Sequence, residues 1–244
     1  SASFVARTAS PNNALWVHND YMSFYENDVK KYRDFFEKIK IKNFDKIIFV
    51  SEHDKDIFTE NFKELKEKCY YCNNLINYKK IEEKSNEICE DFEQKSNTVT
   101  FINLGRHDEK QKKLSRIIKA SKRLNQEGYI FRVIFIGDGP DSSKYKNEAK
   151  DIKNIEFLGK KSNPYPYLKK SDCLLMSSDF EGYPVVFIES MILGKPIITT
   201  DISDSKKDIK GRFGIVVEKS EDGVYDGMKQ YIEKGFNMEE FNPK

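Results

Sequence analysis

The feature that most constrains the fold is a repeated alternation of short apolar runs with amphipathic stretches. Runs rich in β-branched and aromatic residues, such as residues 45–51 and 99–104, are separated by segments with apolar residues at helical spacing. Strand, helix and strand in this rhythm predict parallel strands joined by right-handed crossovers. The sequence therefore predicts an α/β protein built on doubly wound, Rossmann-like parallel sheets.

Two groups of predicted elements are separated by a polar, acidic stretch at residues 81–95. The first group contains a helical stretch at 24–40, a helix over 53–68, and strands at 14–19, 45–51 and 68–73. The second group contains strands at 99–104, 131–136, 154–158, 172–177, 196–200 and 214–217. We place the domain junction near Ser96, which gives domains of residues 1–95 and 96–244. A doubly wound domain usually has five or six strands, so we expect the first domain to be incomplete.

Composition excludes some classes of partner and favours one compartment. Lys and Arg number 42 against 40 Asp and Glu, and this balance argues against a nucleic-acid partner. No run approaches the ~18 to 20 apolar residues that span a bilayer. Four cysteines in this length are typical of a reducing compartment. We expect a cytoplasmic protein, with peripheral association at the inner face of the plasma membrane left open.

Cys69 and Cys72 form a Cys-x-x-Cys pair. A zinc site requires a second pair or neighbouring histidines, and the sequence offers neither nearby. The alternative is a short buried strand in which small cysteine side chains alternate with tyrosines, and we favour it.

The segment 177–201 holds the strongest chemical signal. An apolar strand ends in a polar loop, and Glu181, Gly182, Tyr183 and Pro184 then lead into an apolar helix. Pro184 suits a first helical turn and Gly194 suits a helix C-cap. The N-terminus of such a helix binds anions through free N–H groups.

Glu181 and Glu189 are separated by seven residues, one before this helix and one inside it. Glu181 can accept hydrogen bonds from sugar hydroxyls, and Glu189 can accept them from a pair of ribose hydroxyls. The alternative is that Glu189 is an ordinary solvated helix residue. Because the helix around it is apolar, Glu189 needs a buried partner, and we favour a binding role.

This pattern resembles the Glu-x7-Glu motif of retaining GT-B glycosyltransferases of the group 1, or family 4, type. Residues 101–124 look like the segment that opens the family's second domain, with its strand, Gly-Arg and lysine. Residues 133–140 (VIFIGDGP) resemble the next strand and glycine turn, and residues 155–163 resemble the base-binding loop. Members of the family synthesise bacterial capsule, lipopolysaccharide and wall polysaccharides.

The resemblance implies a role for each matching residue. Arg106 and a nearby lysine would clamp the donor diphosphate, Glu181 would face the transferred sugar, and His18 would face that sugar from the first domain. The lysine usually lies five residues after the arginine, where this chain has Gln111. The downstream sequence favours Lys112 over Lys110. The alternative interpretation of Lys110 is a solvated residue at the start of a basic helix. The remaining donor-site residues would be Gly105, Gly159, Lys160, Gly182, Tyr183, Pro184, Val185 and Glu189.

The function that the resemblance implies is transfer of a hexose-type sugar, with retention, from a nucleoside diphosphate sugar to a glycan or lipid-linked acceptor. UDP-sugars are slightly favoured over GDP-sugars, and no metal or other cofactor is expected. The alternative is a non-catalytic module that binds nucleotide sugars. A phosphorylase would need a lysine for pyridoxal phosphate, and nothing in the sequence marks one.

Overall fold

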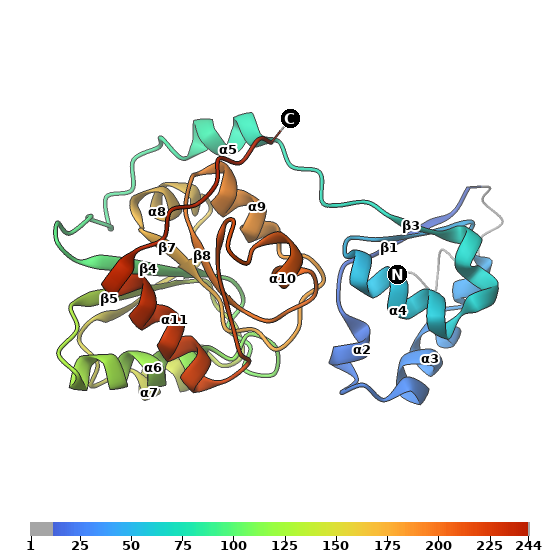
Figure 1. The fold of residues 1–244 in the computed structure, drawn as a ribbon, viewed down its shortest axis with the longest axis horizontal. Helices are drawn as coiled ribbons and strands as arrows, with labels where there is room; N and C mark the ends of the chain where they lie inside the picture. Colours follow the sequence, from blue (N-terminus) through green and yellow to red (C-terminus); the bar gives the residue numbers. More distant parts are fainter. Residues whose placement is uncertain (1–11, 244) are drawn as a thin grey trace. The chain divides into compact units, whose positions relative to one another are not determined.

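The protein is described over residues 12–243 by a computed structural model, in which the chain forms two compact units (Figure 1). Unit 1 comprises the chain up to Leu75 together with Phe180–Pro184, and unit 2 comprises Ile76–Asp179 and Val185–Lys244. Each unit has its own parallel sheet and its own hydrophobic core. The α/β fold class predicted from the sequence is confirmed.

Unit 1 is built on a three-stranded parallel sheet in the order β1-β2-β3. Its elements are β1 (Ala14–Val17), α2 (Tyr21–Phe24), α3 (Val29–Lys38), the 3-10 helix η1 (Ile41–Asn43), β2 (Lys46–Phe49), α4 (Glu52–Asn61), the 3-10 helix η2 (Lys63–Lys68) and β3 (Cys69–Tyr71). Leu15 lies opposite Ile47, and Ile47 lies opposite Cys69. The three strands predicted for this part of the chain are confirmed.

Two helical stretches of unit 1 are shorter than predicted. The stretch 24–40 is interrupted because Glu26 and Asn27 adopt positive φ angles of 56° and 61°, which a helix does not accommodate. The helix predicted over 53–68 leaves helical geometry at Phe62, where φ is −131° and ψ is 62°. The ring of Phe62 is fully buried, so core packing outweighs local helix propensity there.

The strand predicted at residues 68–73 is present as β3, but the prediction that this strand is buried is wrong. Tyr70 and Tyr71 are 48% and 41% exposed. Among the described strands, β3 pairs with β2 alone and therefore lies at the edge of its sheet. Cys69 and Cys72 are free cysteines, and partial burial raises the pKa of the Cys69 thiol to about 11.

The core of unit 1 is aromatic. Phe36 meets Phe58 edge-to-face at 5.0 Å between ring centroids, and Phe58 stacks on Phe62 at 4.7 Å. These rings come from α3, α4 and the turn after α4, and they cover one face of the sheet with Ile47 and Phe49. Each buried ring of this kind contributes about 1.5–3 kcal/mol, so the core gives α3 and α4 a fixed place on the sheet.

Unit 2 is the larger part of the chain. Its elements are α5 (Tyr78–Lys84), β4 (Val99–Leu104), α6 (Leu114–Gln126), β5 (Phe131–Ile136), α7 (Ser142–Glu148), β6 (Ile155–Gly159), α8 (Tyr165–Lys170), β7 (Cys173–Leu175), α9 (Val185–Ile192), β8 (Ile197–Thr200), α10 (Ser205–Asp208), β9 (Gly214–Val217) and α11 (Glu221–Lys234). All six strands predicted for this region are confirmed. No helix within residues 12–243 has the length and apolar character needed to cross a membrane.

The strands of unit 2 form one parallel sheet in the order β6-β5-β4-β7-β8-β9. From the central strand β4 the chain moves outward through β5 to β6, and it then returns to the other side of β4 as β7. At such a switch point the connecting loops diverge beyond the carboxyl ends of the strands and leave a crevice for ligands. The topology therefore predicts a ligand site at the carboxyl ends of the strands.

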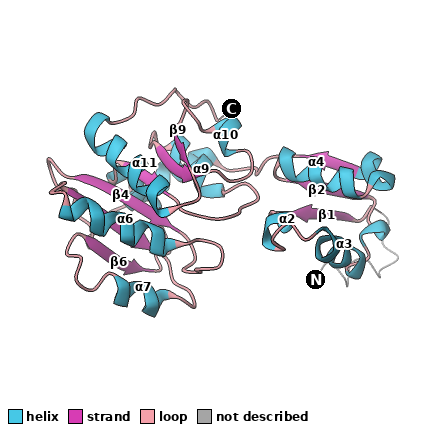
Figure 2. Ribbon diagram, turned by 60° about the horizontal axis from the view of Figure 1, so that its bottom comes forward, coloured by secondary structure: helices cyan, strands magenta, loops and turns pink. Residues whose placement is uncertain are grey.

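Helices cover both faces of this sheet (Figures 1 and 2). On one face Phe101, Val133 and Phe135 pack with the apolar sides of α6 and α11. The alternate residues Ile102 and Ile134 are also fully buried and point to the opposite face. Because both faces are covered, the strands are mostly apolar, as is usual for parallel sheets.

The segment between the two sheets packs on unit 2. Helix α5 contacts α8 and α9, and Arg132 donates a hydrogen bond to the carbonyl of Glu93 at 2.8 Å. Asp91 forms an ion pair with Lys161 in the loop after β6. Residues 76–95, which were predicted as part of the first domain, therefore group with unit 2 by their contacts.

Candidate functional site

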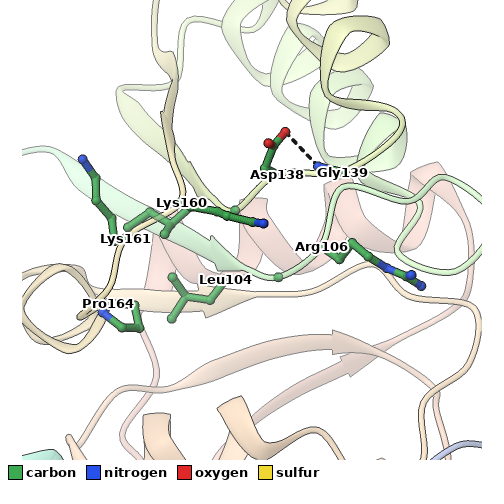
Figure 3. Close-up of a pocket in the computed structure, with 10 residues that line it drawn as sticks. Leu104, Arg106, Asp138, Gly139, Lys160, Lys161 and Pro164 are labelled. Atoms are coloured by element: carbon green, nitrogen blue, oxygen red, sulfur yellow. Dashed lines mark hydrogen bonds between the residues drawn. The ribbon is translucent and has the colours of Figure 1, made fainter.

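A pocket opens beyond the carboxyl ends of β4, β5 and β6 in unit 2 (Figure 3). Its volume is about 500 Å³, which is in the usual range for small-ligand sites. The residues that line it are Leu104, Gly105, Arg106, Ile136, Gly137, Asp138, Gly139, Lys160, Lys161 and Pro164. The pocket lies at the carboxyl ends of the parallel strands, the side of such a sheet where ligands bind.

Two glycines allow the loops after β4 and β5 to touch. A Cβ on Gly137, whose φ is +145°, would lie 1.8 Å from the carbonyl oxygen of Gly105. A Cβ on Gly139 would lie 2.3 Å from the carbonyl oxygen of His107. Neither position has room for a side chain, so these glycines shape the pocket wall by close backbone approach.

Charged side chains surround the pocket. Asp138 accepts hydrogen bonds from Ser142 Oγ at 2.6 Å and from the backbone N–H of Gly139 at 2.8 Å, and these bonds lower the pKa of its carboxyl. Lys160 and Lys161 follow Gly159 on the next loop, and their side chains point in opposite directions (Figure 3).

Within residues 12–243, no group of three or more His, Cys, Asp or Glu side chains is arranged to hold a metal ion.

Arg106 and Lys112, the residues predicted to bind the diphosphate, both lie beside Gly105. Arg106 follows Gly105 directly, is 61% exposed and forms an ion pair with Asp108 at 2.7 Å. The Cε and Nζ atoms of Lys112 lie 3.7 and 3.9 Å from the point that a Cβ on Gly105 would occupy. The half-buried Lys112 thus lies next to a glycine that lines the pocket, whereas Lys110 is exposed. The binding roles of Arg106 and Lys112 stay predictions.

A set of contacts that the sequence did not indicate holds the loop that carries Lys112. Ser177 Oγ donates to the carbonyl of Lys112 at 2.9 Å, and the backbone N–H of Asp179 donates to the carbonyl of Gln111 at 2.8 Å. Arg116 of α6 donates to Asp179 Oδ1 at 2.6 Å and to the carbonyl of Ser177 at 3.0 Å. The residues that follow β7 therefore hold the loop between β4 and α6 in place.

Glu189 lies in the apolar helix α9, as predicted, and Tyr165 supplies the polar partner that it needs. Tyr165 Oη donates a hydrogen bond to Glu189 Oε1 at 3.0 Å. Burial raises the pKa of Glu189, and the bond from Tyr165 opposes this shift. Burial and the nearby Glu189 carboxylate raise the pKa of Tyr165 to about 12. Val185, another predicted site residue, opens the same helix and is 42% exposed.

The other predicted site residues belong to unit 1, namely His18, Glu181, Gly182, Tyr183 and Pro184. Within this unit, a Cβ on Gly182 would lie 2.4 Å from the carbonyl oxygen of His18, so this position admits glycine alone without a backbone shift. Asn74 Nδ2 donates to the carbonyl of Tyr183 at 3.1 Å. Glu181 and Tyr183 are buried, with exposures of 8% and 7%.

A doubly wound parallel sheet with a cationic pocket beyond its strand ends defines a ligand-binding class of α/β proteins. The family comparison makes this class specific. Residues 98–234 match the family model described as glycosyl transferases group 1. The chain belongs to this glycosyltransferase family.

Individual relatives agree with the family. The chain is 31% identical over 201 residues to an uncharacterized glycosyltransferase of Methanocaldococcus jannaschii, with 80% of this chain and 49% of that protein covered. It is 28% identical over 196 residues to a Campylobacter jejuni protein, with 78% and 51% covered. That protein is named N-acetylgalactosamine-N,N'-diacetylbacillosaminyl-diphospho-undecaprenol 4-alpha-N-acetylgalactosaminyltransferase. The chain thus spans about half the length of these relatives.

A solved structure shares the fold. The chain matches Anabaena HepE, solved in complex with UDP and glucose, with a TM-score of 0.73 and 15% identity. The match covers 91% of this chain and 62% of that one. The predicted GT-B class is confirmed by this likeness together with the two parallel sheets.

Proposed function

We propose that this chain is the donor-binding part of a retaining glycosyltransferase. The reaction would transfer a hexose-type sugar from a nucleoside diphosphate donor to a glycan or lipid-linked acceptor in capsule, lipopolysaccharide or wall polysaccharide synthesis. The observation that carries the proposal is the pocket beyond β4, β5 and β6 with Arg106 and Lys112 beside it. Because the chain spans about half of its relatives, the activity is proposed for the whole protein.

The chemistry of a diphosphate fits the charges at this pocket. The guanidinium of Arg106 can donate two parallel hydrogen bonds to phosphate oxygens, and Lys112 adds a compact positive charge. Negative charge builds on the diphosphate as it leaves the sugar, and fixed cations stabilise it most in that state. In this proposal no metal ion is required, since side chains do the neutralising.

The proposed step exchanges one glycosidic bond for another. The bond from the sugar C1 to the diphosphate oxygen breaks, and a bond from C1 to the acceptor oxygen forms on the same face. The acceptor proton passes to the leaving diphosphate, so no protein base is needed. The roles that follow are Glu189 at the ribose, and Glu181 and His18 at the transferred sugar. These roles come from the family resemblance.

The names of similar proteins support the choice of donor and acceptor. Anabaena HepE was solved with UDP and glucose, which favours UDP over GDP as the nucleotide here. The name of the Campylobacter relative describes transfer of N-acetylgalactosamine to a diphospho-undecaprenol-linked acceptor. A lipid-linked acceptor would bring the protein to a membrane surface, and the inner face of the plasma membrane is the proposed place.

Titration calorimetry with UDP, GDP and ADP tests nucleotide binding, with R106Q and R123Q as matched variants. Arg106 pairs with Asp108 at 2.7 Å and Arg123 pairs with Asp222 at 2.9 Å, and both arginine side chains are exposed. Arg106 lines the pocket, whereas Arg123 does not. R106Q is expected to weaken binding about tenfold or more, because a charged hydrogen bond contributes about 1.5–3 kcal/mol. R123Q should bind like wild type, and equal affinity in R106Q would remove Arg106 from the site.

An assay of product release separates the enzyme from the alternative, a module that only binds nucleotide sugars. The whole protein, given a sugar nucleotide and a lipid-linked acceptor, should release free nucleoside diphosphate. A binding module would bind the donor with no release. Release should persist in EDTA, and a requirement for added divalent metal would contradict the proposed neutralisation by Arg106 and Lys112.

A further inference from the structure

Tyr165 lies next to the pocket along the chain and hydrogen-bonds to Glu189. It opens α8 directly after Pro164, which lines the pocket. Its backbone N–H donates to Asn163 Oδ1 at 3.2 Å, and Asn163 Nδ2 donates to the carbonyl of Lys84 at 2.9 Å. The main chain at Tyr165 is therefore held in place, and its hydroxyl reaches Glu189 from a defined position.

The carboxylate of Glu189 has few partners. Among residues 12–243, Tyr165 Oη is the one side-chain group that hydrogen-bonds to it, and no described cation lies in ion-pair range. Both side chains are half-buried. A carboxylate in such a place needs donors for both oxygens, and the bond from Tyr165 engages Oε1 alone.

We propose that Tyr165 is a positioning residue for donor binding: its hydroxyl holds one oxygen of Glu189 so that the other faces the ribose hydroxyls of the nucleotide. This inference rests on the proposed function, because it takes Glu189 as the ribose ligand. A vicinal diol offers two O–H donors, which suit the free lone pairs of a carboxylate whose orientation is set in advance. Without Tyr165, nucleotide binding would have to order the flexible glutamate side chain itself.

The surroundings of Glu189 make the effect of Tyr165 visible in a pH profile. Burial raises the pKa of Glu189 and the Tyr165 hydrogen bond lowers it. Helix α5 packs against both α8 and α9, and none of the charged residues on α5 and α8 contributes to this shift: Lys79, Lys80, Glu82, Glu83, Lys84, Lys169 and Lys170. Removing the hydroxyl should therefore raise the pKa of Glu189 further, so that binding is lost at a higher pH as the solution is acidified.

The test compares Y165F with Y167F. Both tyrosines lie on α8, and each donates its hydroxyl to one carboxylate, Tyr165 to Glu189 and Tyr167 to Asp91. Each variant keeps the ring and removes one such bond. Calorimetry between acidic and neutral pH would use whichever of UDP, GDP and ADP the wild type binds best. Y165F is expected to bind about tenfold more weakly, which corresponds to about 1.4 kcal/mol, and to lose binding at a higher pH. Y167F should do neither.

A 2′-deoxy nucleoside diphosphate with the same base gives a second readout. Since it lacks one ribose hydroxyl, the penalty of Y165F should shrink with this ligand, as expected for two changes that affect one contact. Equal penalties for the ribose and deoxyribose ligands would overturn the positioning role, and so would wild-type affinity and pH profile in Y165F. Melting temperatures of Y165F and Y167F show whether either variant is generally destabilised.

E189A separates a failure of this inference from a failure of the proposed function. If E189A weakens binding while Y165F does not, Glu189 is a ligand and the role of Tyr165 is wrong. If the wild type binds none of the three diphosphates, or E189A binds as well as wild type, the proposed function or its ribose site is wrong.

Discussion

His107 joins the two loops that build the pocket. Its backbone N–H donates to the carbonyl of Asp138 at 3.1 Å, and its ring Nδ1 lies 2.8 Å from Ser142 Oγ. Ser142 also donates to Asp138, so the three residues form one chain of hydrogen bonds that ends at the pocket. The ring is buried among aromatic side chains, those of Phe135, Tyr145 and Phe157. Its Nε2 has no hydrogen-bond partner within residues 12–243.

The buried ring of His107 should make stability depend on pH. Burial lowers the pKa of His107, an effect that Asp138 partly opposes. The unfolded chain takes up a proton near pH ~6.5, whereas the folded chain resists it. The contribution of His107 to the free energy of unfolding is therefore fully present above that pH. It is lost as the pH falls further, towards the lower pKa that His107 has in the folded chain. Urea unfolding at neutral and acidic pH measures this loss.

H107Q should lose less stability on acidification than wild type, because it has no imidazole to protonate. H53Q is the matched control, since His53 is exposed on α4 and outside the pocket. It should keep the wild-type dependence. An unchanged pH dependence in H107Q would show that other groups cause the loss.

At the scale of elements, α6 and the end of β7 hold the loop between β4 and α6. Arg116 and Asp179 are 63 residues apart and form a close ion pair with 20% and 30% of their side chains exposed. Ser177 Oγ lies 2.9 Å from the carbonyl oxygens of both Lys112 and Lys113 and shares its one proton between them. Because Lys112 lies beside Gly105, which lines the pocket, the ion pair keeps a predicted phosphate ligand in place.

R116M should weaken both stability and diphosphate binding. Loss of a half-buried charged hydrogen bond costs about 1.5–3 kcal/mol, and the freed loop no longer presents Lys112 to the ligand. K119M is the matched control on the same helix, since Lys119 is 61% exposed and 3.7 Å from Glu221, and such surface pairs contribute about 0–1 kcal/mol. Urea unfolding and calorimetry check the two effects. Full nucleotide affinity in a destabilised R116M would limit the ion pair to a structural role.

At the scale of the molecule, the two units have separate cores and one contains the pocket. Trp16, the one tryptophan of the chain, lies in β1 of unit 1, whereas all pocket-lining residues belong to unit 2. A ligand that binds the native state raises stability by about 2.7 kcal/mol at a hundredfold excess over its Kd. When two units unfold independently, only the unit that binds the ligand gains this stability.

UDP is therefore expected to shift urea unfolding of unit 2 and to leave unfolding of unit 1 in place. Trp16 fluorescence reports on unit 1, and far-ultraviolet circular dichroism reports mainly on the larger unit 2. In saturating UDP the circular dichroism transition should move to higher urea while the fluorescence transition stays. A common shift of both signals would show that the units unfold as one cooperative body.

The sequence by itself determined the strands and their parallel arrangement. Runs such as residues 131–136 are apolar at every position but Arg132, because both faces of a parallel sheet are buried. Such runs are recognisable without knowledge of their neighbours. The glycine turn after β5 and the helix around Glu189 were found in the same way, because their chemistry is local.

The tertiary structure decided what depends on contacts between distant residues. Phe62 ends a helix because its ring enters a core built from other helices, and Tyr70 is exposed because β3 lies at a sheet edge. Tyr165 meets Glu189 from 24 residues away. No spacing rule covers such a contact, because it depends on how α8 and α9 pack, and packing is decided by the shapes of many side chains together.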